Sequence, residues 1–178
     1  MKHTIEGRAI RYGNDISTDL IIAGKYTKTT NLNELAMHAM EDLDPCFQQK
    51  VQAGGILVAG EYFGCGSSRE QAPVALREAQ VRCVIAKSFA RIFYRNAVNV
   101  GLPIIECDTD RISDNDELEY TFGDDMLKNM TTGEDITVRP LPEMMLRIFC
   151  AGGLTQYIKE NRGFEDIQET PRKEKVIR

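Results

Sequence analysis

The sequence of 178 residues has no pair of cysteines in a CxxC arrangement and only two histidines. Its five cysteines stand at wide, irregular intervals, and neither His3 nor His38 has the spacing of a metal ligand. These absences exclude a zinc knuckle and a self-contained set of iron–sulfur ligands, so we expect no metal and no cofactor bound by this chain. Most of the cysteines have apolar or small neighbours, which predicts buried thiols in a reducing compartment.

Long apolar runs and an excess of basic residues are also missing. No run approaches the roughly 20 residues of a membrane span, and residues 1–13 lack the apolar core of a signal peptide. The net charge is -5, whereas binding to phosphates normally requires a basic face. We therefore expect a cytoplasmic protein that binds neither a membrane nor nucleic acid.

The composition is that of a globular chain. Hydrophobic residues make up 42% and charged residues 28%, which is too apolar for disorder throughout. The length suits one domain with a closed core. We predict a single domain over residues 1–162, followed by a charged tail over residues 163–178 that has few apolar anchors.

The middle of the chain alternates between short apolar runs and helix-like stretches. The helix-like stretch before Gly101 keeps helical spacing of apolar residues, and the glycine supplies a C-terminal stop. Crossovers of this length place strands parallel with helices outside them, which predicts an α/β fold. The predicted order is strand, helix, strand, helix, strand, over residues 54–60, 70–80, 81–86, 89–100 and 102–107.

The rest of the chain is expected to decorate this mostly parallel sheet, partly as an additional β portion. The polar stretch 108–116 is predicted to be a surface loop. Further strands are predicted at 4–12 and 20–23, a late β pair at 118–122 and 136–138, and helices at 33–40, 142–148 and 154–160.

The most informative segment is 62–73, with the sequence YFGCGSSREQAP. It follows a predicted strand and opens a predicted helix, so its backbone amides converge where the helix dipole is positive. Gly64 and Gly66 let the chain turn sharply, and Ser68 with Gln71 has the spacing of a capping box. Such a loop would bind a carboxylate or a phosphate. The residues alone leave open a simpler interpretation, a capped helix with an incidental anion site.

Two other types of phosphate-binding loop fit this segment poorly. Gly64 and Gly66 would begin a dinucleotide-binding fingerprint, but Arg69 stands where the third glycine should allow close helix–strand packing. A Walker loop is excluded because no lysine followed by serine or threonine ends a suitable glycine run.

The same loop carries a resemblance to a known family. GCGSSREQAP, followed by AKSFARI at 86–92 and by Asn96, resembles the free-standing swivel domain of the aconitase superfamily. NDISTDLII at 14–22 and AGGL at 151–154 extend the resemblance, in the family's order, over about residues 10–160. The chain is identified as a member of this family, which comprises the small subunits of 3-isopropylmalate dehydratase, homoaconitase and related hydro-lyases. The resemblance implies a single α/β domain of the swivel type.

The resemblance also implies a reaction and a partner. In this family a 2-hydroxy dicarboxylate loses water and regains it in the opposite sense. The partner is a large subunit, whose cysteines hold a [4Fe-4S] cluster that binds the departing hydroxyl as a Lewis acid. The first activity implied is the isopropylmalate isomerisation of leucine biosynthesis. The alternatives are a homoaconitase, a dimethylmalate or citramalate type of dehydratase, or a non-catalytic anion-binding or assembly subunit, because a fold does not establish a function.

Four residues of the loop are expected to form the family's site. Ser67 matches the catalytic serine, which as an alkoxide removes the carbon-bound proton; loop amides, a helix N-terminus and a cation are suitable means to stabilise that oxyanion. Arg69 matches the arginine that binds a substrate carboxylate, a task suited to a planar bidentate donor. Ser68 and Gly66 complete the expected substrate-binding loop. Gln71 stands where the family often has histidine, and no catalytic role is expected for it.

A second segment, GKYTKTT at residues 24–30, matches the loop that reaches the variable side group of the substrate in this family. Lys28 lies where homoaconitase-like members carry a basic residue, and Thr29 follows it in the predicted substrate-binding set. An ammonium facing an isopropyl group would lose hydration without compensation, so Lys28 favours a polar or charged side group. The alternative is a lysine that points to solvent. Asp19 is expected to brace the neighbouring loop.

Overall fold

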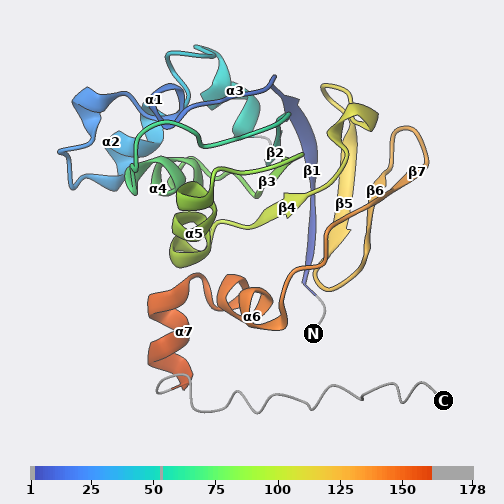
Figure 1. The fold of residues 1–178 in the computed structure, drawn as a ribbon. Coiled ribbons are helices and arrows are strands. Elements are labelled where there is room, and N and C mark those ends of the chain that lie inside the picture. Colours follow the sequence, from blue (N-terminus) through green and yellow to red (C-terminus); the bar gives the residue numbers. More distant parts are fainter. Residues whose placement is uncertain (1–2, 53, 162–178) are drawn as a thin grey trace.

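The computed structural model describes residues 3–52 and 54–161, whose strands form one seven-stranded sheet in the order β4-β3-β2-β1-β5-β6-β7 (Figure 1). The first four strands in this order are parallel to one another, whereas β5, β6 and β7 are each antiparallel to the strand before them in the sheet. The strands are β1 (Thr4–Arg11), β2 (Gly55–Val58), β3 (Cys83–Ala86), β4 (Ile104–Glu106), β5 (Glu117–Thr121), β6 (Met126–Asn129) and β7 (Glu134–Thr137).

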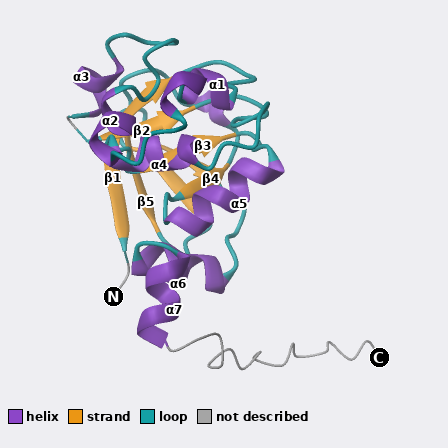
Figure 2. Ribbon diagram, turned by 90° about the vertical axis from the view of Figure 1, so that its left-hand side faces the viewer, coloured by secondary structure: helices purple, strands orange, loops and turns teal. Residues whose placement is uncertain are grey.

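The helices of the first hundred residues lie on one side of the parallel strands, and β5 to β7 lie on the other (Figure 1). Two later helices sit beneath α5, at the end of the sheet where the chain begins (Figure 2). The helices are α1 (Thr18–Ile21), α2 (Leu32–Met37), α3 (Phe47–Val51), α4 (Gln71–Glu78), α5 (Arg91–Val100), α6 (Glu143–Ala151) and α7 (Leu154–Asn161), with 3-10 turns at Gly24–Tyr26 and Thr109–Arg111.

The central strands are buried on both faces, which explains their continuous apolar runs. Neighbouring side chains alternate between two clusters, because successive residues of a strand point to opposite faces. Leu57 of β2 and Val84 of β3 belong to the cluster under the helices. Ile56 and Val58 pack with Tyr120 in the second cluster, on the opposite face of the sheet.

The sheet is curled so that its two outer strands meet at one end. Cys107, which follows β4, forms an antiparallel bridge with Val138, which follows β7. The backbone N–H of Arg139 also donates to the carbonyl of Glu106, at 2.8 Å. The parallel half and the antiparallel half are therefore joined twice, once through β1 and β5 and once through these residues.

The predicted α/β fold is confirmed, including the parallel strands, their crossover helices and the additional β portion. Gly101 ends α5 in a left-handed conformation, with φ 78°. The predicted strand at 20–23 is wrong, because residues 18–21 form α1. Ser17 caps this helix by accepting the N–H of Leu20. A short apolar run does not by itself distinguish a buried strand from a buried turn of helix.

Three other expectations are corrected. The segments 118–122 and 136–138 do not pair with each other, because the unpredicted β6 lies between them; its sequence MLKN lacks β-branched and aromatic residues. The polar stretch 108–116 is not simply a surface loop, since Thr109 and Ile112 are buried. Of the cysteines, only Cys83 is fully buried, whereas two are partly exposed and Cys46 and Cys150 are exposed.

The predicted domain boundary after residue 162 and the predicted tail lie outside the described residues, so both stay predictions. Within residues 3–52 and 54–161, no helix has the length and apolar character that crossing a membrane requires.

A buried polar contact fixes the antiparallel half of the sheet. Asn129, at the end of β6, is 1% exposed, and its Nδ2 donates to a carboxylate oxygen of Asp116 at 2.7 Å. The same carboxylate accepts the backbone N–H of Ser113 at 2.7 Å. The side-chain oxygen of Asn129 accepts the N–H groups of Thr131 and Thr132 in the turn that follows. One amide therefore satisfies a buried carboxylate and a tight turn together.

We expect Asn129→Asp to lower the free energy of unfolding by about 3 kcal/mol, because it replaces the donor to Asp116 with a second buried carboxylate. Met130→Asp is the matched control, since it adds the same charge one residue later on a side chain that is 57% exposed. The control should change stability by less than about 0.5 kcal/mol. Urea unfolding of both variants measures the difference, and equal losses would contradict the role of Asn129.

Candidate functional site

The segments that follow β1, β2 and β3 are hydrogen-bonded to one another at the carboxyl end of the parallel strands. The N–H of Glu61 donates to the side-chain oxygen of Asn14, at 2.8 Å. The N–H of Gly64 donates to the carbonyl of Ile16, and the N–H of Ala90 donates to the carbonyl of Phe63, both at 2.8 Å. This edge of a parallel sheet is where ligands bind in open α/β folds.

The two glycines of segment 62–70 have left-handed backbones for different reasons. Gly64 has φ 79°, and a Cβ there would lie 2.2 Å from Cγ of Phe93, so helix α5 packs directly against its backbone. Gly66 has φ 85°, and a Cβ there would meet nothing closer than 3.6 Å. Gly64 is therefore required by packing, whereas Gly66 is required only by the direction of the turn.

Thr18 holds the loop in place with both its backbone and its side chain. Its N–H donates to the carbonyl of Cys65, and its hydroxyl donates to the carbonyl of Ser67, both at 2.8 Å. Thr18 is 2% exposed, so water does not compete for either bond. The backbone that carries Ser67 is thus fixed to the first turn of α1.

The loop presents unused hydrogen-bonding groups to solvent. Gly66, Ser67 and Ser68 are exposed, and in the described part of the chain the Ser67 hydroxyl forms no hydrogen bond. The backbone N–H groups of the same three residues also have no acceptor among the described residues. Helix α4 begins at Gln71, so these donors lie just before its positive end. A carboxylate placed here would gain several donors at once.

Arg69 is already partnered within the chain. Its guanidinium donates to the carbonyl of Ile22 at 2.8 Å and forms an ion pair with Asp19. The arginine side chain is 18% exposed, whereas that of Asp19 is 55% exposed. The structure thus places Asp19 where it braces Arg69, and a substrate carboxylate would share the guanidinium with it or displace it.

The predicted capping box of Ser68 and Gln71 is wrong. Helix α4 starts at Gln71, and Glu70 occupies the cap position without a side-chain hydrogen bond to the helix. The Gln71 side chain instead donates to the carbonyl of Thr27, at 3.0 Å. Gln71 therefore connects segment 62–70, called the glycine loop below, to segment 24–30.

Segment 24–30 lies beside Arg69, as the two predicted groups of site residues require. A Cβ at Gly24 would stand 3.3 Å from Nη2 of Arg69. Lys28 is exposed, and its side chain has no hydrogen bond or ion pair with any described residue. The Thr29 hydroxyl is occupied, because it donates to Glu34 at 2.6 Å and accepts the N–H of Asn31. Lys28 is the free group of the predicted pair, and Thr29 is held to the start of α2.

Cys65 stands in the loop as a thiol rather than a thiolate. Burial and the negative charge of Asp15 raise the pKa of the Cys65 thiol. Its sulfur lies 3.5 Å from the carbonyl oxygen of Asp15, to which it donates. A protonated thiol is a weak nucleophile, so the structure gives no support for Cys65 as a reactive group.

The described residues do not fit a metal site. Nowhere in residues 3–52 and 54–161 do three His, Cys, Asp or Glu side chains gather closely enough to hold an ion. The iron–sulfur cluster implied by the family resemblance therefore finds no ligand set in this part of the chain.

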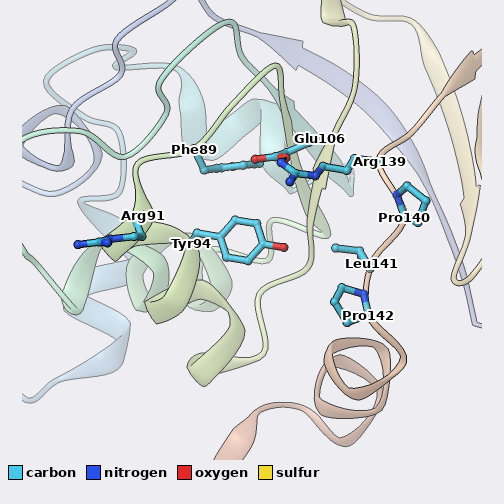
Figure 3. A pocket seen from close by; sticks show the side chains of 8 residues that line it. All are labelled: Phe89, Arg91, Tyr94, Glu106, Arg139, Pro140, Leu141 and Pro142. Atoms are coloured by element: carbon cyan, nitrogen blue, oxygen red, sulfur yellow. The ribbon is translucent and has the colours of Figure 1, made fainter. Parts of the chain in front are cut away.

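A cavity of about 560 Å³, which no residue of segment 62–73 lines, was not predicted (Figure 3). It lies between the start of α5, the end of β4 and residues 139–142, three segments that sequence spacing does not connect. The ring of Tyr94 and the ion pair of Glu106 with Arg139, at 2.8 Å, line it, whereas the side chain of Arg91 extends away from the other labelled side chains. Glu106 and Arg139 therefore neutralise each other within its lining.

Comparison with known proteins places these residues in a family. Residues 4–109 match the aconitase C-terminal domain family. The chain is 52% identical over 158 residues to a 3-isopropylmalate dehydratase small subunit of Ruminiclostridium cellulolyticum, covering 88% of this chain and 97% of the relative. It is 49% identical over 162 residues to the isopropylmalate/citramalate isomerase small subunit of Methanocaldococcus jannaschii, covering 90% and 96%.

A solved structure shows the same fold. The crystal structure of a 3-isopropylmalate dehydratase from Methanocaldococcus jannaschii aligns with a TM-score of 0.85 and 45% sequence identity. The alignment covers 90% of this chain and 96% of that chain, so both the parallel and the antiparallel halves are included.

The two loop glycines should respond differently to alanine. Gly64→Ala should lower the free energy of unfolding by about 3 kcal/mol, because the new methyl group meets the ring of Phe93 in a left-handed backbone. Gly66→Ala should lose only about 1 kcal/mol, since it adds the same backbone strain in open space. Each variant is the control for the other in urea unfolding. Losses of equal size would contradict the packing assigned to Gly64.

Proposed function

The chain belongs to the family of 3-isopropylmalate dehydratase small subunits within the aconitase superfamily, and we propose that it is the small subunit of a hydro-lyase that interconverts 2-isopropylmalate and 3-isopropylmalate. One observation carries the proposal: the loop that matches the family's catalytic segment presents an unpaired Ser67 hydroxyl, free amides and a braced arginine on one edge of the sheet.

The proposed partner is a large subunit. The relatives are named as small subunits, which supports the existence of a second, larger chain. We place the [4Fe-4S] cluster on that chain, where it would act as a Lewis acid, because the described residues here offer it no ligands. The cytoplasm is the proposed location, and five cysteines outside any disulfide are compatible with a reducing compartment.

Ser67 is proposed to move the proton. Its oxygen, as an alkoxide, would take the proton from the substrate carbon, and the electron pair of that bond would form the carbon–carbon double bond. The hydroxyl would leave the neighbouring carbon as hydroxide, which the Lewis acid proposed for the large subunit would accept. Rehydration in the opposite sense returns the proton from Ser67. No described side chain hydrogen-bonds to the Ser67 hydroxyl, so the positive end of α4 and the charge of Arg69 would stabilise the alkoxide.

Arg69, Ser68 and Gly66 are proposed to bind a carboxylate of the substrate. The guanidinium is held on one side by Ile22 and Asp19, which fixes its plane before the substrate arrives. The amides of Gly66 and Ser68 have no other acceptor in the described chain. Binding and proton transfer then occur on one loop, within a few residues of each other.

One observation favours a second candidate substrate. Lys28 is exposed and unpaired on the segment that lies against Arg69 and Gln71. A 2-hydroxy acid with an additional carboxylate, as for a homoaconitase, would pair with this ammonium, whereas an isopropyl group would not. Lys28 and Thr29 stay proposed contacts of the substrate side group.

The test of the proposed function is Ser67→Ala in the complex with the large subunit. Removing the hydroxyl deletes the proton acceptor but keeps the amides and Arg69, so kcat should fall by about 10²- to 10⁴-fold with little change in KM. Ser68→Ala is the matched control, because it removes a neighbouring hydroxyl but keeps the backbone amide proposed to bind substrate; its effect should be small and confined to KM. Near-normal turnover by Ser67→Ala in the assembled complex would refute the catalytic assignment.

Lys28→Val tests the choice of substrate. It should raise the ratio of kcat/KM for isopropylmalate over homocitrate by about tenfold. The variant has no ammonium that must lose hydration against the isopropyl group, and valine cannot pair with the additional carboxylate of homocitrate. Lys159→Val, on an exposed lysine of α7, is the control for the loss of one positive charge. A ratio that is the same in wild type, variant and control would remove Lys28 from the substrate site.

A further inference from the structure

Four side chains, two from segment 24–30 and two from the chain beside it, form a cluster that the proposed mechanism does not use. Tyr26 stacks on His38, with ring centroids 3.9 Å apart and planes 8° from parallel. Nδ1 of His38 lies 2.5 Å from a carboxylate oxygen of Glu41. The ammonium of Lys25 lies 3.3 Å from the other oxygen and 4.7 Å from the centre of the Tyr26 ring. Imidazole, phenol ring, carboxylate and ammonium thus contact one another.

The carboxylate is the centre of this cluster. Burial disfavours its charged form, but hydrogen bonds from His38, Tyr26 and Lys25 outweigh burial and lower the pKa of the Glu41 carboxyl. Glu41 is therefore ionised at neutral pH and accepts hydrogen bonds from residues on both sides. Two of these residues, Lys25 and Tyr26, belong to the 3-10 turn Gly24–Tyr26, and His38 ends α2.

The α2 side of the cluster is attached to the rigid part of the fold. Met40 is fully buried, and its N–H donates to the carbonyl of Ile21, the last residue of α1, at 2.8 Å. Its φ of 61° is uncommon for a residue other than glycine, and such strain persists only where the surrounding packing fixes it. The adjacent carbonyl, of Ile22, accepts from Arg69. His38 and Glu41 therefore flank a residue that is tied to the same short helix as the arginine of the site.

Segment 24–30 is anchored at three points with Lys28 between them. The first is the contact of Tyr26 and Lys25 with His38 and Glu41. The second is the bond from Gln71 to the carbonyl of Thr27, and the third is the bond from Thr29 to Glu34. The anchors surround Lys28, whose ammonium has no hydrogen bond or ion pair with any described residue.

We propose that His38 is a positioning residue, which together with Glu41 holds Tyr26 and so fixes how closely Lys28 approaches the side group of the substrate. This inference rests on the proposed function and extends it, because it assigns substrate selection partly to a histidine of α2 that does not touch the substrate. His38 keeps the turn in one place, and Lys28 then samples few positions. Without the stack, the segment keeps the ion pair of Lys25 with Glu41, the bond from Gln71 and the bond from Thr29 to Glu34.

The first measurement is hydrogen exchange on the full chain. His38→Ala should speed exchange at the amide of Thr29, which donates to the carbonyl of Tyr26, by about two- to tenfold, the range that an aromatic contact supports. The amide of Leu35 in α2 serves as the internal reference. His38→Phe keeps a stacking ring and should restore slow exchange in part, whereas Met37→Ala, on an adjacent side chain that is 61% exposed, should have no effect.

The second measurement uses the same variants in the complex with the large subunit. His38→Ala should raise KM for the preferred acid by about two- to tenfold with little change in kcat. It should also bring the ratio of kcat/KM for isopropylmalate and homocitrate closer to one. Glu41→Gln, which keeps the shape of the side chain but removes its charge, should shift both readouts in the same direction. It provides a second variant in case His38→Ala folds poorly.

The outcomes separate the inference from the function on which it rests. Unchanged exchange in both His38→Ala and Glu41→Gln would overturn the inference, as would faster exchange with unchanged KM and preference, because the stack would then be structural only. A wild-type complex that turns over none of the acids would refute the proposed function instead.

Discussion

The candidate site depends on the attachment of the glycine loop to Thr18. Strands β1 and β2 are neighbours in the sheet, so the segments that follow them leave the same edge side by side. Thr18 uses this proximity twice, through its N–H and its hydroxyl, and both bonds are shielded from water. Because Thr18 also begins α1, the same short helix supplies Asp19 to Arg69, and the residue that follows the helix, Ile22, supplies its carbonyl. The short helix α1 thus fixes the positions of both Ser67 and Arg69.

As a result, some groups of the loop are fixed by the protein and others have no partner in the described chain. The backbone of residues 65–67 and the guanidinium are fixed by the protein, whereas the Ser67 hydroxyl and the amides before α4 are left for a ligand. Preorganised donors of this kind need no rearrangement when negative charge develops. Segment 24–30 completes the arrangement from the other side, and there the structure fixes Tyr26 and Thr29 while leaving Lys28 free.

The sequence was sufficient for the parallel core and for the position of the loop, because buried strands and amphipathic crossover helices have strong local patterns. It failed where tertiary contacts decided the outcome. The run at 20–23 became helical through a cap at Ser17, and β6 is a strand because its neighbours pair with it rather than because of its residues. Likewise, Gln71 has the spacing of a cap but donates across to Thr27. The Asp19–Arg69 pair and the His38–Tyr26 stack join residues whose proximity no motif encodes.

The curl of the sheet has a consequence for the chain when it is alone. An open sheet of seven strands would expose two rows of unpaired backbone groups, which are templates for pairing with other chains. Here the continuation of β7 lies on the end of β4, through the Cys107–Val138 bridge and the bond from Arg139 to Glu106. Each edge thereby shields part of the other. The mutual cover of the two edges in this way opposes self-association by strand addition.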